Sequence, residues 1–423
     1  MTDTIFALSS GSPPAAIGVL RVTGPRALAA LEALAGPLPP ARRAVLRTLR
    51  DPAGAVLDEA LVLVFPGPAS ATGEDCGELH CHGGRAVVSA VCAALGAHPG
   101  LRAAEPGEFT RRAFLNGRID LAQAESLADL LAAETELQRR AAQAGVGGAL
   151  SFEVERGRSE VLTLSAMVEA ALDFSDEEGA DTLPPEFVAR REALRTELVH
   201  ALARPRAERL REGVRVVLTG PPNSGKSSLF NALVRDSAAI VTPQAGTTRD
   251  VLERPVAFSG VPFVLVDTAG LRESGAGEIE ALGIDRAHDQ VSRADLVLWL
   301  GPEGEGPADA IEIQSRSDDP AASRKRSPDH VVSTVTGEGL ADLETDLINR
   351  ATRLLPKPGV AAVNARQAKL LDEASEALGV NTDDLLLLAE SLRAARHAFD
   401  RLLGRAGVED MLDELFARFC IGK

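Results

Sequence analysis

The segment VRVVLTGPPNSGKSSLF, residues 214–230, decides the fold of the middle of the chain. Its first six residues have the apolar pattern of a buried strand, and Lys226 to Val234 have the pattern of a helix. Between them, Gly220 to Ser227 fits G-x-x-x-x-G-K-S, and the strand–loop–helix order is the context in which this motif forms a P-loop. The alternative is a glycine-rich turn that binds no ligand. The sequence therefore predicts a phosphate-binding loop at the start of a helix.

The composition of this loop suits a nucleoside triphosphate with Mg²⁺. Glycines let the backbone pass close to phosphates, and amide N–H groups at a helix N-terminus supply positive potential. Lys226 is expected to reach the β- and γ-phosphates, and Ser227 to ligate Mg²⁺. The expected nucleotide contacts of the loop are Asn223, Ser224, Gly225, Lys226, Ser227 and Ser228.

Two further segments have the composition of the switch loops that sense a γ-phosphate. Asp267-Thr-Ala-Gly270 follows the apolar run Val261 to Val266, and Gly246-Thr-Thr-Arg-Asp250 lies between this run and the P-loop. A carboxylate at the end of a strand can hold Mg²⁺, directly or through water, and Thr248 would supply a second hydroxyl. The residues expected at the nucleotide are Thr242, just before the first of these segments, and, within the two segments, Thr247, Thr248, Asp267, Thr268, Ala269 and Gly270.

One position departs from the usual GTPase pattern in a way that bears on catalysis. Leu271 follows the second switch motif, where many GTPases carry the glutamine that orients the attacking water. Since leucine cannot orient water, another group must provide that positioning and positive charge.

Base recognition is the weakest part of the predicted site. Ser315-Arg-Ser-Asp318 follows Ile311-Glu-Ile313, at the place where Asn-Lys-x-Asp is expected. Asp318 could accept two hydrogen bonds from the guanine edge. Ser315 replaces the structural asparagine, and Arg316 replaces the lysine that stacks on the base. Residues 333–339 resemble the last base-contacting loop.

The remainder of the chain divides into mixed and helical segments. Residues 1–117 read as mixed α/β, with strands at Ile17–Val22 and Leu61–Phe65, the latter expected to be buried, and helices at Pro25–Leu34 and Val87–Leu95. Helical periodicity then extends from Phe109 to Ala144, from Ser151 to Ala171, from Pro185 to Arg211, and over residues 361–419.

We therefore expect a multidomain α/β and α protein. A P-loop GTPase domain, a parallel sheet with helices on both faces, is inserted into a helical domain. Its further elements are expected at Ile279–Ser292 (helix) and Leu296–Leu300 (strand). The expected boundaries are 1–117 for the N-terminal domain, 118–212 and 358–423 for the helical domain, and 213–357 for the GTPase domain.

Bulk composition narrows the class of partner and the compartment. A formal net charge of −16 over 423 residues argues against a dedicated basic groove for nucleic acid, although a local patch or a partner protein could hold RNA. The four cysteines at irregular spacing predict no disulfide framework, which favours a cytoplasmic protein. The start of the chain has no signal-peptide pattern, and no apolar run approaches the ~18 residues of a membrane span.

With these residues in view, the chain resembles the MnmE (TrmE) family of tRNA-modification GTPases over nearly its whole length. The shared motifs include Thr72-Gly-Glu-Asp75, Arg112-Ala-Phe-Leu-Asn-Gly117, Gly246-Thr-Thr-Arg-Asp250 and the terminal Phe419-Cys-Ile-Gly-Lys423. A C-terminal Cys-Ile-Gly-Lys behind a helical domain is the most specific of them.

The resemblance implies an α+β N-terminal domain that binds folate and dimerises. It also implies a flavin- and NADH-dependent partner, MnmG (GidA), which with the homodimer forms a heterotetramer. Together they would install an aminomethyl or carboxymethylaminomethyl group on carbon five of the tRNA wobble uridine. The one-carbon unit would come from a tetrahydrofolate derivative, of the 5-formyl or methylene type.

The resemblance also supplies a substitute for the missing glutamine: potassium-dependent dimerisation of the GTPase domains, with K⁺ acting like an arginine finger. By position, the water-orienting residue is Glu280, and the K⁺ ligands are Asn223, Thr242, Gln244 and Thr247.

The folate contacts implied by the resemblance are Arg21, Glu78, Arg118 and Lys423, with cations for the glutamate carboxylates and Glu78 for the pterin edge. Arg118 replaces a frequent lysine. Cys420 is a candidate catalytic thiol, whereas Cys76, Cys81 and Cys92 are expected to be packing thiols. His82 is expected to be a structural hydrogen-bonding residue.

Two other classes of function remain open at this point. One is a ribosome-assembly or RNA-binding GTPase, which calls for a basic RNA-binding module after the GTPase domain, and residues 361–423 lack one. The other is a nucleotide-regulated scaffold with negligible hydrolysis, which the altered segment Ser315–Asp318 keeps open.

Overall fold

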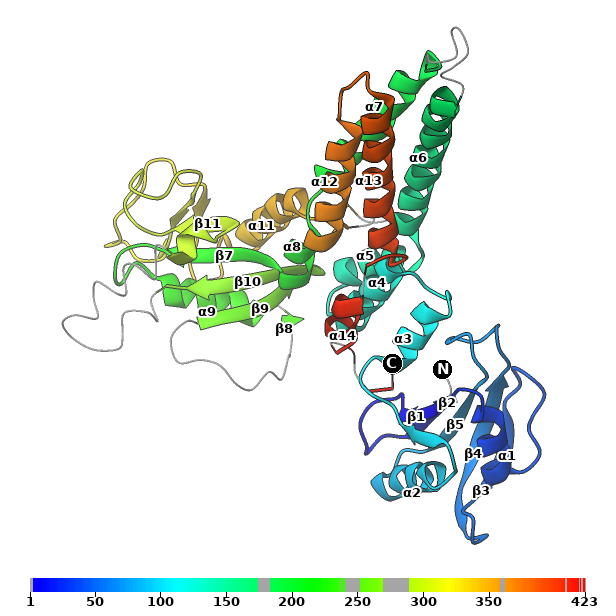
Figure 1. Cartoon of the computed structure of the whole chain (residues 1–423). Helices are drawn as coiled ribbons and strands as arrows, with labels where there is room; N and C mark the ends of the chain where they lie inside the picture. Colours follow the sequence, from blue (N-terminus) through cyan, green and yellow to red (C-terminus); the bar gives the residue numbers. More distant parts are fainter. Residues whose placement is uncertain are drawn as a thin grey trace, which may run out of the picture. The chain divides into compact units, whose positions relative to one another are not determined.

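The computed structural model describes residues 3–173, 183–236, 238–239, 252–268, 289–357, 362–407, 409–417, 419 and 421–422. The chain forms two compact units (Figure 1). The first comprises Met1–Ala128 and His397–Lys423, and the second comprises Asp129–Arg396. Each unit is described by itself.

In its described part, the first unit contains a six-stranded sheet in the order β3-β4-β5-β2-β1-β6. All neighbours are antiparallel except β1 and β6, which are parallel. The strands are β1 (Thr4–Leu8), β2 (Ile17–Thr23), β3 (Val45–Arg50), β4 (Val56–Phe65), β5 (Cys76–His82) and β6 (Leu101–Ala103).

The two faces of this sheet differ in chemistry because side chains alternate along each strand. The apolar face, with Leu20, Val22 and Leu79, forms a core with helices α1 (Ala27–Ala35) and α2 (Arg85–Gly96). The other face carries polar side chains from the same strands. The prediction of a buried strand at 61–65 is therefore wrong in part: β4 begins five residues earlier, and the side chain of Leu61 is 42% exposed.

Helix α3 (Glu108–Leu115) packs against the C-terminal helix α14 (Glu409–Ala417) within this unit. Their approach is close at Gly107, which has a φ of 68° and where a Cβ atom would lie 2.3 Å from the carbonyl oxygen of Phe416. Helix α4 (Leu121–Ala132) begins in the same unit and contributes Leu121 to this core.

In its described part, the second unit contains a seven-stranded sheet in the order β13-β12-β11-β7-β10-β9-β8. The run from β13 to β10 is parallel, as expected, and an antiparallel pair, β9 and β8, extends its edge. The strands are β7 (Val214–Thr219), β8 (Ala238–Ala239), β9 (Leu252–Phe258), β10 (Val261–Asp267), β11 (Leu296–Trp299), β12 (Ile311–Gln314) and β13 (His330–Val331).

Helices that precede this α/β region in the sequence form one bundle with helices that follow it. Helix α7 packs against α6, which precedes it, and against α12, which follows the sheet (Figure 1). Arg191 on α7 donates to the carbonyl of Val380, just after α12, at 2.9 Å. The helices of this unit are α5 (Glu136–Val146), α6 (Ala149–Asp173), α7 (Glu186–Leu202), α8 (Ala207–Glu212), α9 (Lys226–Asp236), α11 (Leu340–Leu354), α12 (Ala365–Leu378) and α13 (Leu385–Leu403), which continues into the first unit.

The expected single helix from Pro185 to Arg211 is wrong. Helix α7 ends at Leu202, and α8 begins at Ala207. Pro205 lies between them, and a proline lacks the N–H that a continuing helix would use. The expected helix at 279–292 falls mainly on residues outside the described part. Among the described residues, no helix has the length and apolar character that crossing a membrane requires.

Candidate functional sites

The loop after β7 has the backbone conformation of a phosphate-binding loop. Gly220 has a φ of 146° and Gly225 a φ of 95°, values that L side chains rarely adopt. A Cβ atom at Gly220 would lie 3.0 Å from the amide nitrogen of Gly301, so the loop also needs its first glycine for space. Asn223, with a φ of 59°, completes the turn into α9.

The ammonium group of Lys226 is held over this loop. Its side chain is buried, and Nζ donates to the carbonyl oxygens of Gly220 at 3.0 Å and Pro221 at 2.7 Å. Phosphate oxygens are stronger acceptors than these carbonyls, because hydrogen bonds between charged groups are the strong ones. The position of this ammonium fits a triphosphate lying in the loop.

The second predicted loop starts at the same edge of the sheet. Strand β10 lies parallel to β7, with Asp267 opposite Leu218. Thr268 donates its hydroxyl to the carbonyl of Leu218 at 2.8 Å. Because the carboxyl ends of parallel strands meet at one edge, the buried Asp267 carboxylate and the P-loop belong to one site. A hydroxyl at Ser227 and a carboxylate are the oxygen ligands that Mg²⁺ prefers.

The base-recognition segment is joined to the P-loop by the serine that replaces the expected asparagine. Ser315 follows β12, and its Oγ donates to the carbonyl oxygen of Ser224 at 2.7 Å. Asp318 accepts a hydrogen bond from Ser333 Oγ at 2.5 Å, and Ser333 belongs to the last predicted base loop. Three segments distant in sequence are thus tied together where a base would bind.

A Ser315→Ala variant tests this link. Losing one intramolecular hydrogen bond typically costs ~1 kcal/mol, so we expect GTP to bind about fivefold more weakly. Titration calorimetry with GTP would measure the change. Thr345→Ala, which removes an exposed hydroxyl on α11, is the control and should bind like the parent. Unchanged affinity in Ser315→Ala would show that the Ser315–Ser224 bond does not support the site.

Several predicted residues lie outside the part of the chain that the structure describes. They are Thr242, Gln244, Thr247, Thr248, Ala269, Gly270, Glu280, Cys420 and Lys423. Their assigned roles therefore remain predictions from the sequence.

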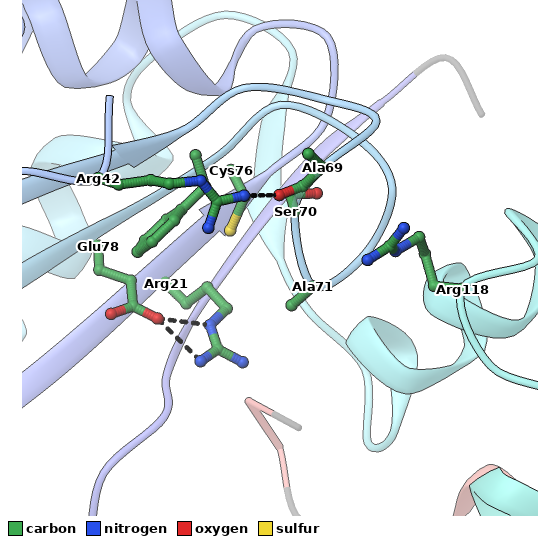
Figure 2. A pocket seen from close by; sticks show the side chains of 9 residues that line it. Arg21, Arg42, Ala69, Ser70, Ala71, Cys76, Glu78 and Arg118 are labelled. Atoms are coloured by element: carbon green, nitrogen blue, oxygen red, sulfur yellow. Dashed lines mark hydrogen bonds and ion pairs between the residues drawn. The ribbon is translucent and has the colours of Figure 1, made fainter. Parts of the chain in front are cut away.

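The polar face of the first unit's sheet forms a second pocket, with a volume of about 350 Å³ (Figure 2). Arg21 and Glu78 are paired across β2 and β5, and Arg21 donates to Glu78 Oε1 from Nε at 3.1 Å and from Nη2 at 2.8 Å. The structure thus brings together three of the four predicted folate residues. The lining residues are Arg21, Arg42, Phe65, Ala69, Ser70, Ala71, Cys76, Glu78 and Arg118.

The charge states of this pocket follow from its contacts. Burial alone would raise the pKa of Glu78, but hydrogen bonds and positive charge from His80 and Arg21 outweigh it, so the pKa is lowered. Glu78 is therefore an anion at neutral pH. Burial raises the pKa of the Cys76 thiol to about 11, so this cysteine stays protonated. The expected packing role suits it, although it also lines the pocket.

Of the other residues singled out in the sequence, Cys81 is buried and burial raises its pKa to about 12. His82 pairs with Asp58, its ring Nδ1 lying 2.7 Å from Oδ1. Arg42 was missed, because it belongs to no motif and reaches the pocket only through the fold.

A buried ionic network holds the loop that forms one wall of the pocket. The Arg112 side chain is fully buried. It donates to Glu74 at 3.1 Å, to Glu108 at 3.0 Å, and to the carboxylate and carbonyl of Asp3 at 3.0 Å each. Thr72, two residues from Glu74, accepts from Asn116 through its carbonyl at 2.7 Å. Arg112 and Asn116 of one sequence motif thus hold Glu74 and Thr72 of the other, next to the pocket wall.

The C-terminal motif docks on the same unit. Ile421 forms an antiparallel bridge with Pro106, and the carbonyl of Gly422 accepts a hydrogen bond from Ser9 Oγ at 2.8 Å. A Cβ atom on Gly422 would lie 2.2 Å from the carbonyl oxygen of Leu8, so only glycine fits here. The motif is therefore anchored at this glycine.

The parallel sheet, the loop after β7, the carboxylate after β10 and the base segments after β12 and β13 define the class: a P-loop GTPase. Comparison with known proteins identifies the family within this class. The family model described as "MnmE helical domain" matches residues 121–420, and "GTP-binding protein TrmE N-terminus" matches residues 4–118.

The curated relatives agree over the full length. The tRNA modification GTPase MnmE of Erythrobacter litoralis (strain HTCC2594) is 62% identical over 423 residues, covering 100% of both chains. That of Novosphingobium aromaticivorans is 59% identical, again covering 100% of both. Among solved structures, the G domain of the T. maritima FeoB iron transporter is similar to this chain over 33% of this chain and 98% of its own length, at 24% identity and a TM-score of 0.23.

The two family models and the full-length relatives show the family. The chain belongs to the MnmE family of tRNA modification GTPases.

Proposed function

We propose that the chain hydrolyses GTP to drive modification of the tRNA wobble uridine, together with a flavin-dependent partner of the MnmG (GidA) type. The observation that carries this proposal is the coexistence of a P-loop site with a second, cationic pocket in one chain that matches the tRNA modification GTPases over its whole length. The product is the 5-carboxymethylaminomethyl or aminomethyl group. The working form is a cytoplasmic homodimer that joins its partner in a heterotetramer.

At the nucleotide site, the roles follow from the chemistry of each group. The amides of residues 223–228 and the Lys226 ammonium bind the phosphates, and Asp318 selects guanine. Ser227 and Thr248 would hold Mg²⁺, which would neutralise charge on the phosphate oxygens. The Asn223 side chain stands in the P-loop as a neutral oxygen ligand for K⁺, with Thr242, Gln244 and Thr247 as the other ligands. Glu280 orients the attacking water, the task that Leu271 cannot perform.

The dependence on monovalent cation is testable by phosphate release from GTP. We expect roughly tenfold or greater acceleration in KCl over NaCl at equal ionic strength, because a cation that offsets transition-state charge acts on turnover. Asn223→Ala should lose this difference while still binding nucleotide. Equal rates in the two salts would contradict the potassium proposal and leave the GTPase assignment standing.

In the second pocket, the ligand we propose is a tetrahydrofolate of the 5-formyl or methylene type. Arg21, Arg118 and Lys423 suit the carboxylates of its glutamate tail, and the Glu78 carboxylate suits the amide and amino edge of the pterin. The geometry supports this division, since the Glu78 carboxylate, whose pKa is lowered, lies beside Arg21 on the polar face of the sheet. The bound folate supplies the one-carbon unit, and Cys420 is proposed as a catalytic thiol.

The biological role is tested by the nucleosides of tRNA from cells lacking this gene. We expect the wobble-uridine substituent to disappear and the parent chain to restore it. Cys420→Ser should fail to restore it while keeping GTP turnover, if the thiol takes part. An intact substituent in the deletion strain would overturn the role in tRNA modification, and a ribosome-assembly defect there would favour the RNA-binding alternative.

A further inference from the structure

Two guanidinium groups of the second pocket are left without a negative partner. Arg21 is paired with Glu78, as described above. No ion pair joins Arg42 or Arg118 to a carboxylate anywhere in the residues that the structure covers. Figure 2 shows their guanidinium groups on either side of the segment Ala69–Ala71. The pocket therefore has more positive than negative charge.

Arg42 is exposed to solvent, and its contacts orient its side chain along the pocket that it lines. Its backbone, in the left-handed region at a φ of 63°, donates to the carbonyl of Val64 at 2.9 Å. The guanidinium carbon lies 5.7 Å from the centre of the Phe65 ring, a distance suited to a cation–π interaction. Nη2 donates to the carbonyl of Ala69. A ring on one side and a carbonyl on another thus orient the group.

This orientation leaves N–H donors for a ligand. A guanidinium has five N–H groups, and across the described residues the only acceptor that the Arg42 guanidinium meets is the carbonyl oxygen of Ala69. Planar donors beside an aromatic ring are the arrangement that recognises carboxylates. With Arg118 also unpaired by any carboxylate, the pocket suits a ligand that carries at least two acidic groups.

We propose that Arg42 binds a carboxylate of the ligand's glutamate tail and makes the pocket selective for folates over the same pterin without a tail. This inference rests on the proposed folate function and deepens it. Arg42 is assigned the tail because the pterin edge is neutral and calls for no further cation. The tail carries two carboxylates, and Arg42, like Arg118, forms no ion pair with a carboxylate among the described residues. No motif identifies this residue.

The test is a cycle that combines a residue change with a ligand change, measured by titration calorimetry on the full chain. The ligands are 5-formyltetrahydrofolate and its glutamate-free amide analogue, 5-formyltetrahydropteroamide, which carries no carboxylate. Arg42→Gln should weaken folate binding about tenfold and change binding of the tailless analogue less than about twofold. Only the folate complex loses a charge-assisted hydrogen bond to residue 42. Arg42→Lys should recover part of the loss, because the charge remains and the fork geometry does not.

The adjacent Arg43 provides the matched control. It is exposed, carries the same charge and does not line the pocket, so Arg43→Gln should bind both ligands like the parent. Equal losses for both ligands in Arg42→Gln would overturn the proposal, since they would mean that Arg42 only supports the pocket wall. Unchanged folate binding would overturn it as well. Failure of the parent chain to bind either ligand would instead refute the folate function, and this inference with it.

Discussion

Replacing Lys226 by alanine is expected to lower GTP turnover roughly 10²–10³-fold, the usual effect of removing one preorganised group that stabilises transition-state charge. The ammonium is buried and fixed by two P-loop carbonyls, so no neighbouring cation replaces it by a simple rotation. Its removal also leaves the β- and γ-phosphates without their side-chain counter-charge, so nucleotide affinity should fall too. Phosphate release under saturating GTP and Mg²⁺ measures the loss of turnover.

The matched control for this variant is Lys369→Ala. Lys369 is exposed on α12, so its replacement removes the same charge from the chain without touching the P-loop. It should turn over GTP like the parent. Turnover of Lys226→Ala within about twofold of the parent would show that this ammonium does not stabilise the transition state.

Replacing Arg112 by methionine should be the most destabilising single change in the first unit. The change leaves the carboxylates of Asp3, Glu74 and Glu108 without their shared cation, and breaking a buried ionic network costs about 3–5 kcal/mol. In a unit of this size such a loss lowers the melting temperature on the order of 10 °C. Scanning calorimetry of the full chain would follow the transition of this unit.

Arg393→Met is the control for that measurement. Arg393 pairs with Glu390 on α13, and both side chains are more than half exposed, so the pair contributes little to stability. Its variant should melt within about 2 °C of the parent. Equal shifts in the two variants would show that the buried network around Arg112 does not stabilise the unit.

The same network predicts how stability depends on pH. Burial alone would raise the pKa of Glu108, but hydrogen bonds and charge from Arg102 and Arg112 lower it below its unfolded value, and Asp3 behaves in the same way. A carboxylate whose pKa is lowered on folding stabilises the folded state fully at pH values above its unfolded pKa. This contribution to stability is lost as the pH falls through the folded-state pKa. The parent chain should therefore lose stability below about pH 4, and Arg112→Met should lose less over that range.

The nucleotide half of the site could be predicted well because its signals are local. A strand, a glycine-rich loop and a helix follow one another within residues 214–236, and parallel pairing then brings Asp267 to the same edge. The position of Ser315 directly after a strand could also be predicted from the sequence. Its bond to Ser224, in contrast, depends on two loops far apart in sequence.

Other features could not be predicted because no local pattern encodes them. Strand β9 contains Pro255, which weakens the strand signal, yet this residue lies opposite Val264 in the ladder with β10. Arg42 lies in a turn, and its place at the pocket depends on its contact with Phe65, the last residue of β4. The Arg112 network likewise joins segments more than 30 residues apart in sequence.

Equilibrium binding of GTP to the full chain, with and without Mg²⁺ and in competition with ATP, tests the central claim most directly. A P-loop that holds the phosphates and a carboxylate at residue 318 that selects guanine predict tight, magnesium-dependent binding of GTP that excess ATP does not displace. Binding that ignores magnesium, or that ATP abolishes at equal concentration, would contradict the account.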